Sequence, residues 1–82
     1  MDINDVRLHC HLGEIIKKKN ISALKLSTEI KYRRSTINDL INNVDMENKR
    51  IPAELIAKLC AYFNITPNEL FSVIQKDGSR SE

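Results

Sequence analysis

Two groups of side chains in this 82-residue sequence have types that can do chemistry. The first is His9, Cys10 and His11, with Cys60 as the only other cysteine, and imidazole and thiolate are ligands for Zn²⁺. We expect a helix here, and residues one and two apart do not share a helix face. Because a tetrahedral site would also lack ligands, we predict no metal site and no cofactor. A Cys–His nucleophile needs a pocket that so small a core can hardly form, so we predict no enzyme.

The second group lies between positions 33 and 43 and consists of side chains that hydrogen-bond to DNA. Arginine pairs with guanine, asparagine with adenine, and serine or threonine with several base edges. A helix with such an outer face fits the major groove, which is about 12 Å wide. The alternative is an ordinary solvated helix face. The polar residues of this group are Arg33, Arg34, Ser35, Thr36, Asn38, Asp39, Asn42 and Asn43.

The charge distribution favours nucleic acid as a partner. The chain carries a net charge of +2, but the stretch from Lys17 to Arg50 carries +5 and the two ends together −3. A basic centre with acidic flanks is a mild signal for nucleic-acid binding. No apolar run approaches the roughly 20 residues of a membrane span, and the first residues have no signal-peptide core. We therefore expect a cytoplasmic protein with no membrane partner, in which Cys10 and Cys60 stay reduced.

Capping residues and apolar spacing predict that five short helices position these side chains. The fold class we expect is all-α, a compact five-helix domain over residues 1–74 followed by a polar, disordered tail over 75–82. A short strand over Val6–Leu8 is the alternative for the beginning of the chain. The first expected helix starts at Asp5 and ends near Lys17–Lys19, the second covers 23–30 and the third 34–42. The fourth starts at Pro52 and includes Phe63, and the fifth runs from Thr66 to about Ile74.

The order of capping, apolar and polar residues along the chain is similar to that of the Cro/C1-type (lambda-repressor-like, xenobiotic-response-element) helix-turn-helix family. The resemblance covers roughly Leu12 to Phe71, and it implies a DNA-binding domain whose recognition helix starts near Arg34. The matching residues are Ser22, Leu26, Ser27, Ile30, the run Arg34-Ser35-Thr36-Ile37, Leu40, Leu59, the run Phe63-Asn64-Ile65, and Glu69-Leu70.

The resemblance also implies a role for each polar residue. Residues at base-facing positions are Arg34, Ser35, Asn38 and Asp39, and Asp39 either accepts from a cytosine amino group or orients an arginine by a salt bridge. Residues expected to contact phosphate, which fixes register rather than sequence, are Arg33, Thr36, Asn42 and Asn43, with Lys49 and Arg50 near the flanking phosphate.

The sequence departs from the family pattern at four places. Lys31 stands where glycine is usual, which costs about 1 kcal/mol if the left-handed conformation is kept. Arg33 replaces the usual serine or threonine cap, and Ala23 replaces a glutamine that contacts phosphate in relatives. The loop after the third helix is longer than usual and carries acidic residues, namely Asp45 and Glu47.

The function we predict is sequence-specific binding of double-stranded DNA by a small bacterial or phage transcription regulator, in particular a repressor. We expect a homodimer, with Phe71 and Val73 as the contact between subunits. An antitoxin or a restriction–modification controller would use the same DNA-binding domain. A protein-interaction module without DNA binding is the third possibility, favoured by Asp39, the acidic loop and an exposed Leu24.

Overall fold

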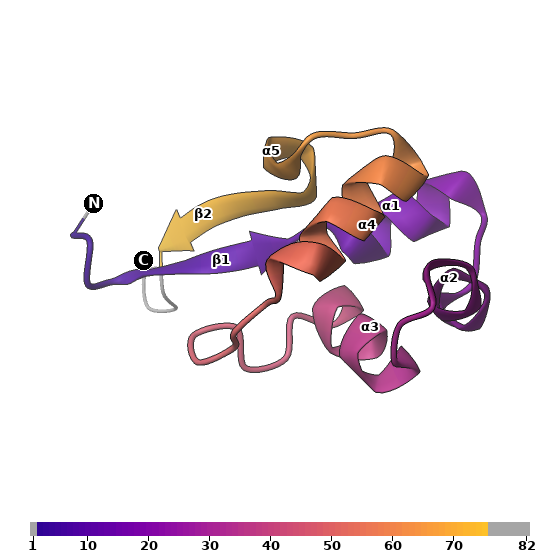
Figure 1. The fold of residues 1–82 in the computed structure, drawn as a ribbon. Helices are drawn as coiled ribbons and strands as arrows, with labels where there is room; N and C mark the ends of the chain where they lie inside the picture. The colour runs from indigo at the N-terminus through magenta and orange to yellow at the C-terminus, as the bar shows by residue number, and fades with distance from the viewer. Residues whose placement is uncertain (1, 76–82) are drawn as a thin grey trace.

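Five helices form the body of the molecule, and a two-stranded antiparallel sheet projects from it, giving extents of 39 × 23 × 22 Å (Figure 1). The computed structural model describes residues 2–75. None of the helices in this range is long and apolar enough to cross a membrane. The elements are β1 Val6–Cys10, α1 Leu12–Lys19, α2 Ala23–Ile30, α3 Arg34–Ile41, α4 Ala53–Phe63, α5 Pro67–Leu70 and β2 Phe71–Gln75.

The all-α prediction is wrong, because both ends of the described chain form strands. Strand β1 pairs with β2 in a register that places Cys10 opposite Phe71 and Leu8 opposite Val73. The first helix begins only at Leu12, and the alternative of a strand over Val6–Leu8 is confirmed and extends to Cys10. The predicted fifth helix ends after one turn, so Phe71 and its successors are strand.

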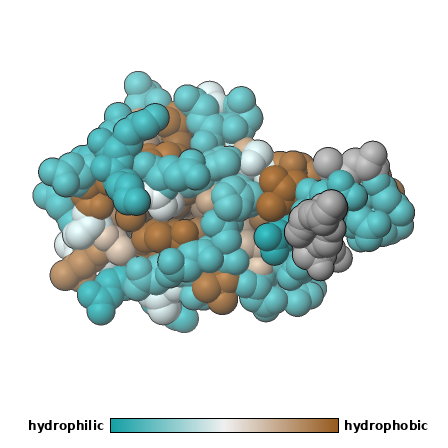
Figure 2. Space-filling view, turned by 180° about the vertical axis from the view of Figure 1, so that it is seen from behind, coloured by the Kyte–Doolittle hydropathy of each residue, from teal (hydrophilic) through white to brown (hydrophobic). Residues whose placement is uncertain are grey.

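Side-chain alternation explains why these two segments are strands. Residues opposite each other in an antiparallel pair share a face, so Leu8 and Cys10 of β1 form one apolar face with Phe71 and Val73 of β2. Figure 2, the view from behind, shows an apolar patch where the sheet joins the helical body, with polar side chains around it. The strand includes Gln75, which we had placed in the tail, and the rest of that tail lies outside the described residues.

Local signals fix the helix boundaries between the strands. Helix α2 starts where Ser22 caps it, with the Ser22 Oγ accepting a hydrogen bond from Lys25 N at 3.0 Å. It ends at Lys31, which keeps the left-handed conformation at φ 56°. The capping box of α5 is present, with Thr66 N donating to Glu69 Oε1 at 2.8 Å. These three boundaries confirm the sequence prediction.

The core is mainly aliphatic, includes two phenylalanines, and takes residues from every element. One member, Met46, comes from the loop after α3. Cys60 packs half-buried against this core. The buried apolar residues are Cys10, Leu12, Leu26, Ile30, Ile37, Leu40, Met46, Leu55, Leu59, Phe63, Leu70 and Phe71.

Helix α1 approaches the end of α3 closely at Gly13. A Cβ atom at this position would lie 3.2 Å from the Ile41 carbonyl oxygen, which is tighter than ordinary contact. Glycine at this position therefore makes room for the close contact between the two helices. This contact and the core residues Ile37 and Leu40 hold α3 with its polar side outward.

Candidate nucleic-acid interface

Helix α3 has one buried side and one exposed polar side. Ile37 and Leu40 are fully buried, whereas the residues on the opposite side are exposed or, for Asp39, half-exposed. At 100° per residue these polar side chains fall within an arc of about 140°. The arc consists of Arg34, Ser35, Asn38, Asp39 and Asn42. Such a face presents arginine, serine and asparagine donors and acceptors together, as readout of base edges requires.

The turn between α2 and α3 is short and carries two basic residues. Lys31 ends α2 and Arg33 precedes α3 without a side-chain capping bond, and both are exposed. Between them Tyr32 is half-buried against the core. Lys58 Nζ lies 5.7 Å from the centre of the Tyr32 ring and donates to the Ile30 carbonyl at 3.1 Å. These contacts from α4 fix the turn and so the angle at which α3 leaves it.

A strip of basic residues runs alongside α3. One hollow is lined by Lys31, Tyr32, Arg33 and Thr36, and an adjoining one also contains Tyr32 and Thr36. The adjoining hollow brings in Lys49 and Arg50 from the loop after α3. We call Lys31, Arg33, Lys49 and Arg50 the basic strip. Sequence reasoning missed Lys31 as a member, although its place at the end of α2 was the signal.

Asp39 joins α3 to the basic strip. Its Oδ2 atom lies 3.3 Å from Lys49 Nζ, and both side chains are partly exposed. The pair therefore holds Lys49 beside the polar arc and neutralises part of its charge. The partner of Asp39 in this salt bridge is a lysine of the loop and not the arginine that we expected.

Asn42 and Asn43 are adjacent but lie in different surroundings. Asn42 is exposed at the end of α3. Asn43 is left-handed at φ 53°, and its amide makes two hydrogen bonds to the backbone of Cys10. Cys10 N donates to Asn43 Oδ1 at 2.7 Å, and Asn43 Nδ2 donates to Cys10 O at 3.0 Å. The Asn43 side chain thus ties the end of α3 to β1.

The acidic residues of the long loop are engaged in contacts of their own. Glu47 lies 3.8 Å from Arg7 of β1, which holds the loop beside the strand. Asp45 accepts from the Asn48 side chain at 3.0 Å. With Asp39 paired to Lys49, all three carboxylates near α3 have partners. Their repulsion toward a phosphate backbone is therefore reduced.

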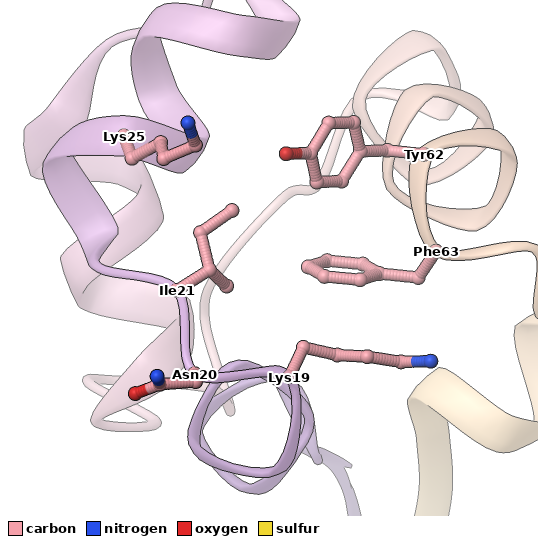
Figure 3. A pocket seen from close by; sticks show the side chains of 6 residues that line it. All are labelled: Lys19, Asn20, Ile21, Lys25, Tyr62 and Phe63. Atoms are coloured by element: carbon pink, nitrogen blue, oxygen red, sulfur yellow. The ribbon is translucent and has the colours of Figure 1, made fainter.

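A separate hollow of about 370 Å³ lies between the α1–α2 turn and the end of α4 (Figure 3). Lys19 and Lys25 line it together with Tyr62 and Phe63, and the Tyr62 hydroxyl points across it toward α2. None of its lining residues is a carboxylate, a histidine or a cysteine. The hollow therefore offers no carboxylate, imidazole or thiol group, and the polar arc of α3 remains the candidate site.

Comparison with protein families confirms the resemblance seen in the sequence. The model of the Cro/C1-type HTH DNA-binding domain matches residues 11–76, which include all five helices and β2 but begin after β1. A comparison with curated proteins found no significant match. The matched family supports DNA binding and a role in transcription regulation, and it is not typically enzymatic. The chain belongs to the Cro/C1-type helix-turn-helix family of DNA-binding domains.

Proposed function

We propose that this protein is a bacterial or phage transcription repressor that places α3 in the major groove of specific duplex sites. The observation that carries this proposal is the polar arc of α3, which is exposed along the whole helix and flanked by the basic strip. Occupation of an operator would block polymerase sterically. The protein is then a DNA-binding regulator without catalytic activity, working in the cytoplasm.

The roles of the individual residues follow from their positions. Arg34, Ser35 and Asn38 lie on the arc in the N-terminal part of α3 and contact base edges. Asp39 orients Lys49 or accepts from a cytosine amino group. The side chains that contact phosphate are Arg33, Thr36, Asn42, Lys49 and Arg50, with Lys31 added from the structure. We assign Asn43 to the scaffold because both polar atoms of its side chain bond to Cys10.

The experiment that tests the proposal is selection of duplex DNA from a random pool, followed by affinity measurements at two salt concentrations. We expect one enriched sequence and an affinity that falls as salt rises, because phosphate contacts release counterions. Arg34→Ala should weaken binding to that sequence by about 1–3 kcal/mol and relax one base position. Arg33→Ala should weaken binding to all sequences alike. If both variants bind like the parent, α3 is not the recognition helix.

We propose further that the protein acts as a homodimer through the outer edge of β2. Val73 is 60% exposed on this edge strand, whereas Phe71 is only 9% exposed and belongs to the core. Of the two residues expected from the sequence to form the contact between subunits, we therefore keep only Val73 in the proposal. A two-fold dimer places its recognition helices about 34 Å apart, one turn of DNA.

Oligomeric state tests the dimer directly. Val73→Lys should convert a dimer to a monomer in light scattering, because a charge on an edge strand opposes pairing. Leu24→Lys is the matched control, since Leu24 is 56% exposed on α2, away from the sheet. A parent that is monomeric at all concentrations, or a dimer that survives Val73→Lys, would contradict this arrangement.

A protein-interaction module is the second candidate, and the exposure of Leu24 is the observation that favours it. It predicts no salt-dependent affinity for DNA and a partner that protects Leu24 from solvent. An antitoxin or restriction–modification controller would give the same DNA results as a repressor. A toxin or restriction enzyme encoded by a neighbouring gene would distinguish those two roles.

A further inference from the structure

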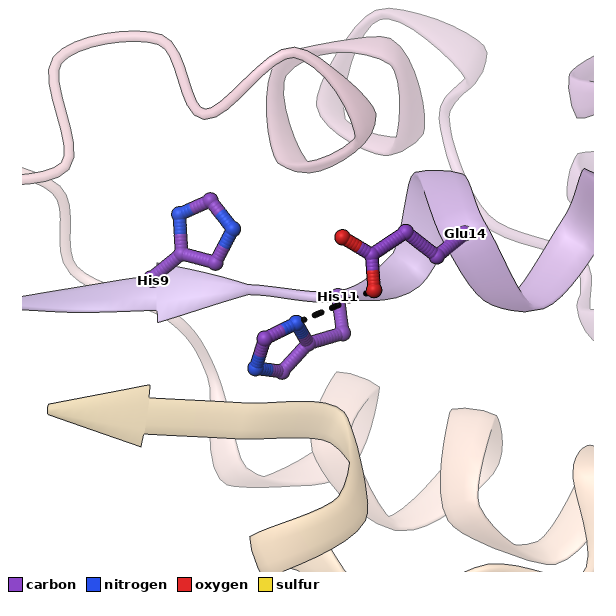
Figure 4. A group of neighbouring side chains, drawn as sticks. All are labelled: His9, His11 and Glu14. Atoms are coloured by element: carbon purple, nitrogen blue, oxygen red, sulfur yellow. Dashed lines mark ion pairs between the residues drawn. The ribbon is translucent and has the colours of Figure 1, made fainter.

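Three side chains with metal-binding atoms converge where β1 meets α1 (Figure 4). They are His9 on β1, His11 between the two elements, and Glu14 in the first turn of α1. Their ligand atoms all lie within 4.8 Å of one another. We predicted no metal site because residues one and two apart do not share a helix face. That reason does not apply to the observed structure, in which β1 ends after His9, at Cys10, and α1 begins after His11.

The hydrogen bonding of His11 suits a metal ligand. Its Nε2 atom lies 2.7 Å from the hydroxyl oxygen of Ser72 on β2, and its Nδ1 atom lies 3.4 Å from Glu14 Oε1. In the tautomer whose Nε2–H donates to Ser72, the Nδ1 lone pair faces Glu14. A metal-binding histidine characteristically donates its other N–H to such a partner, which orients the ring.

We propose that His9, His11 and Glu14 bind a divalent transition-metal ion of the Zn²⁺ class, with water as the fourth ligand. Two imidazoles and one carboxylate are a donor set that Zn²⁺ accepts. Ligand atoms about 2.0–2.1 Å from a tetrahedral ion lie roughly 3.3 Å apart, so the site must contract on binding. Glu14 can supply this movement, because its side chain is 76% exposed.

The neighbouring cysteine does not belong to the donor set. Cys10 is 2% exposed and points to the apolar face of the sheet, opposite to His9. The site is therefore made of nitrogen and oxygen donors.

Lysines of α1 oppose the metal, and two of them, Lys18 and Lys19, line the hollow that contains His11 and Glu14. Lys17 lines the same hollow as His9 and Glu14, one turn further along α1. A positive charge there weakens the attraction between Glu14 and a bound cation. Removal of Lys17 should therefore strengthen metal binding, which gives the proposal a variant with an effect opposite to that of the ligand substitutions.

The test is titration of the tag-free full chain with Zn²⁺ by calorimetry, and with Co²⁺ by visible absorption. We expect one ion per chain and a Co²⁺ spectrum without thiolate charge-transfer bands. Glu14→Gln should raise the dissociation constant at least about tenfold. Substitution of residues that only hydrogen-bond to metal ligands already weakens metal binding by about this factor. His9→Ala should raise it further, and Lys17→Ala should lower it several-fold.

Two controls keep the result interpretable. Glu14→Gln changes an exposed side chain, so circular dichroism should show an unaltered fold. Cys60→Ser should leave the affinity unchanged, since Cys60 lies on α4. No binding by the parent, equal affinity in the Glu14 and His9 variants, or loss of binding in Cys60→Ser would each overturn the site. No DNA is present in these titrations, so their outcome is independent of the proposed function.

Discussion

The α2–α3 unit and the β1–β2 sheet are specified by the sequence in different ways. The boundaries of α2 depend on neighbours in the chain, such as Ser22 bonding to Lys25 three residues later. The strands depend on partners far away, with Cys10 opposite Phe71. Local capping is visible in a sequence window, whereas strand pairing is stabilised only when the distant partner is in place. The unit that carries function is thus the more predictable of the two.

The two regions meet at the asparagine pair that ends α3. Asn42 faces solvent with the polar arc, and Asn43 bonds to β1. The same residue type therefore serves the proposed DNA contact at one position and the scaffold at the next. Substitutions at these two positions separate the contributions of the two regions.

We expect the largest effect from Asn43→Ala. It removes two hydrogen bonds, leaves part-buried backbone groups of Cys10 without partners, and places alanine in the left-handed conformation. Together these changes should lower the free energy of unfolding by about 2–4 kcal/mol. Urea denaturation measures this difference.

Asn42→Ala is the matched control for that experiment. Its side chain is exposed, so stability should change by less than about 0.5 kcal/mol, while affinity for DNA falls. Asn43→Gly should recover about 1 kcal/mol relative to Asn43→Ala, since glycine accepts positive φ. Equal losses of stability at positions 42 and 43 would contradict the division of the two regions.

The errors of prediction follow the same division. The limits of α2 and the capping box of α5 are set by side chains within three residues of them, and both were predicted. The helix expected from Asp5 rested on Leu8 and Leu12, whose spacing of four is also compatible with a strand followed by a helix. Nothing local shows that Leu8 will find Val73.

The candidate site divides in the same way. The polar arc of α3 follows from helical periodicity, so Arg34, Ser35 and Asn38 were named from the sequence. Two features of the site were not predicted from the sequence. They are the hydrogen bonds between Asn43 and Cys10 and the position of Lys49 beside Asp39. Both depend on how the loop after α3 folds back, and its buried anchor, Met46, carries no periodic signal.

The next effect in size concerns Lys31, which holds a left-handed conformation that glycine adopts freely. Lys31→Gly should raise the free energy of unfolding by about 1 kcal/mol and weaken binding to all DNA sequences, because one charge of the basic strip is lost. Lys25→Gly is the control, since it lies inside α2 and should lower stability by about 1 kcal/mol. Urea denaturation of the two variants should give shifts of opposite sign, and shifts of the same sign would show that the turn is not strained.

The smallest effect on stability is expected for Asp39→Asn, which breaks a partly exposed ion pair with Lys49. Such pairs contribute about 0.2–1 kcal/mol and weaken as salt rises. Glu54→Gln breaks a comparable pair with Lys58 on α4, 3.4 Å long, and should have a similar effect on stability.

Only Asp39→Asn frees a lysine of the basic strip, so it alone should raise affinity for non-specific DNA and steepen the salt dependence, by up to about one unit of slope. Fluorescence anisotropy at several salt concentrations measures both quantities. If the two variants bind DNA with the same affinity and slope, Lys49 does not contact phosphate, and the basic strip ends at Arg33.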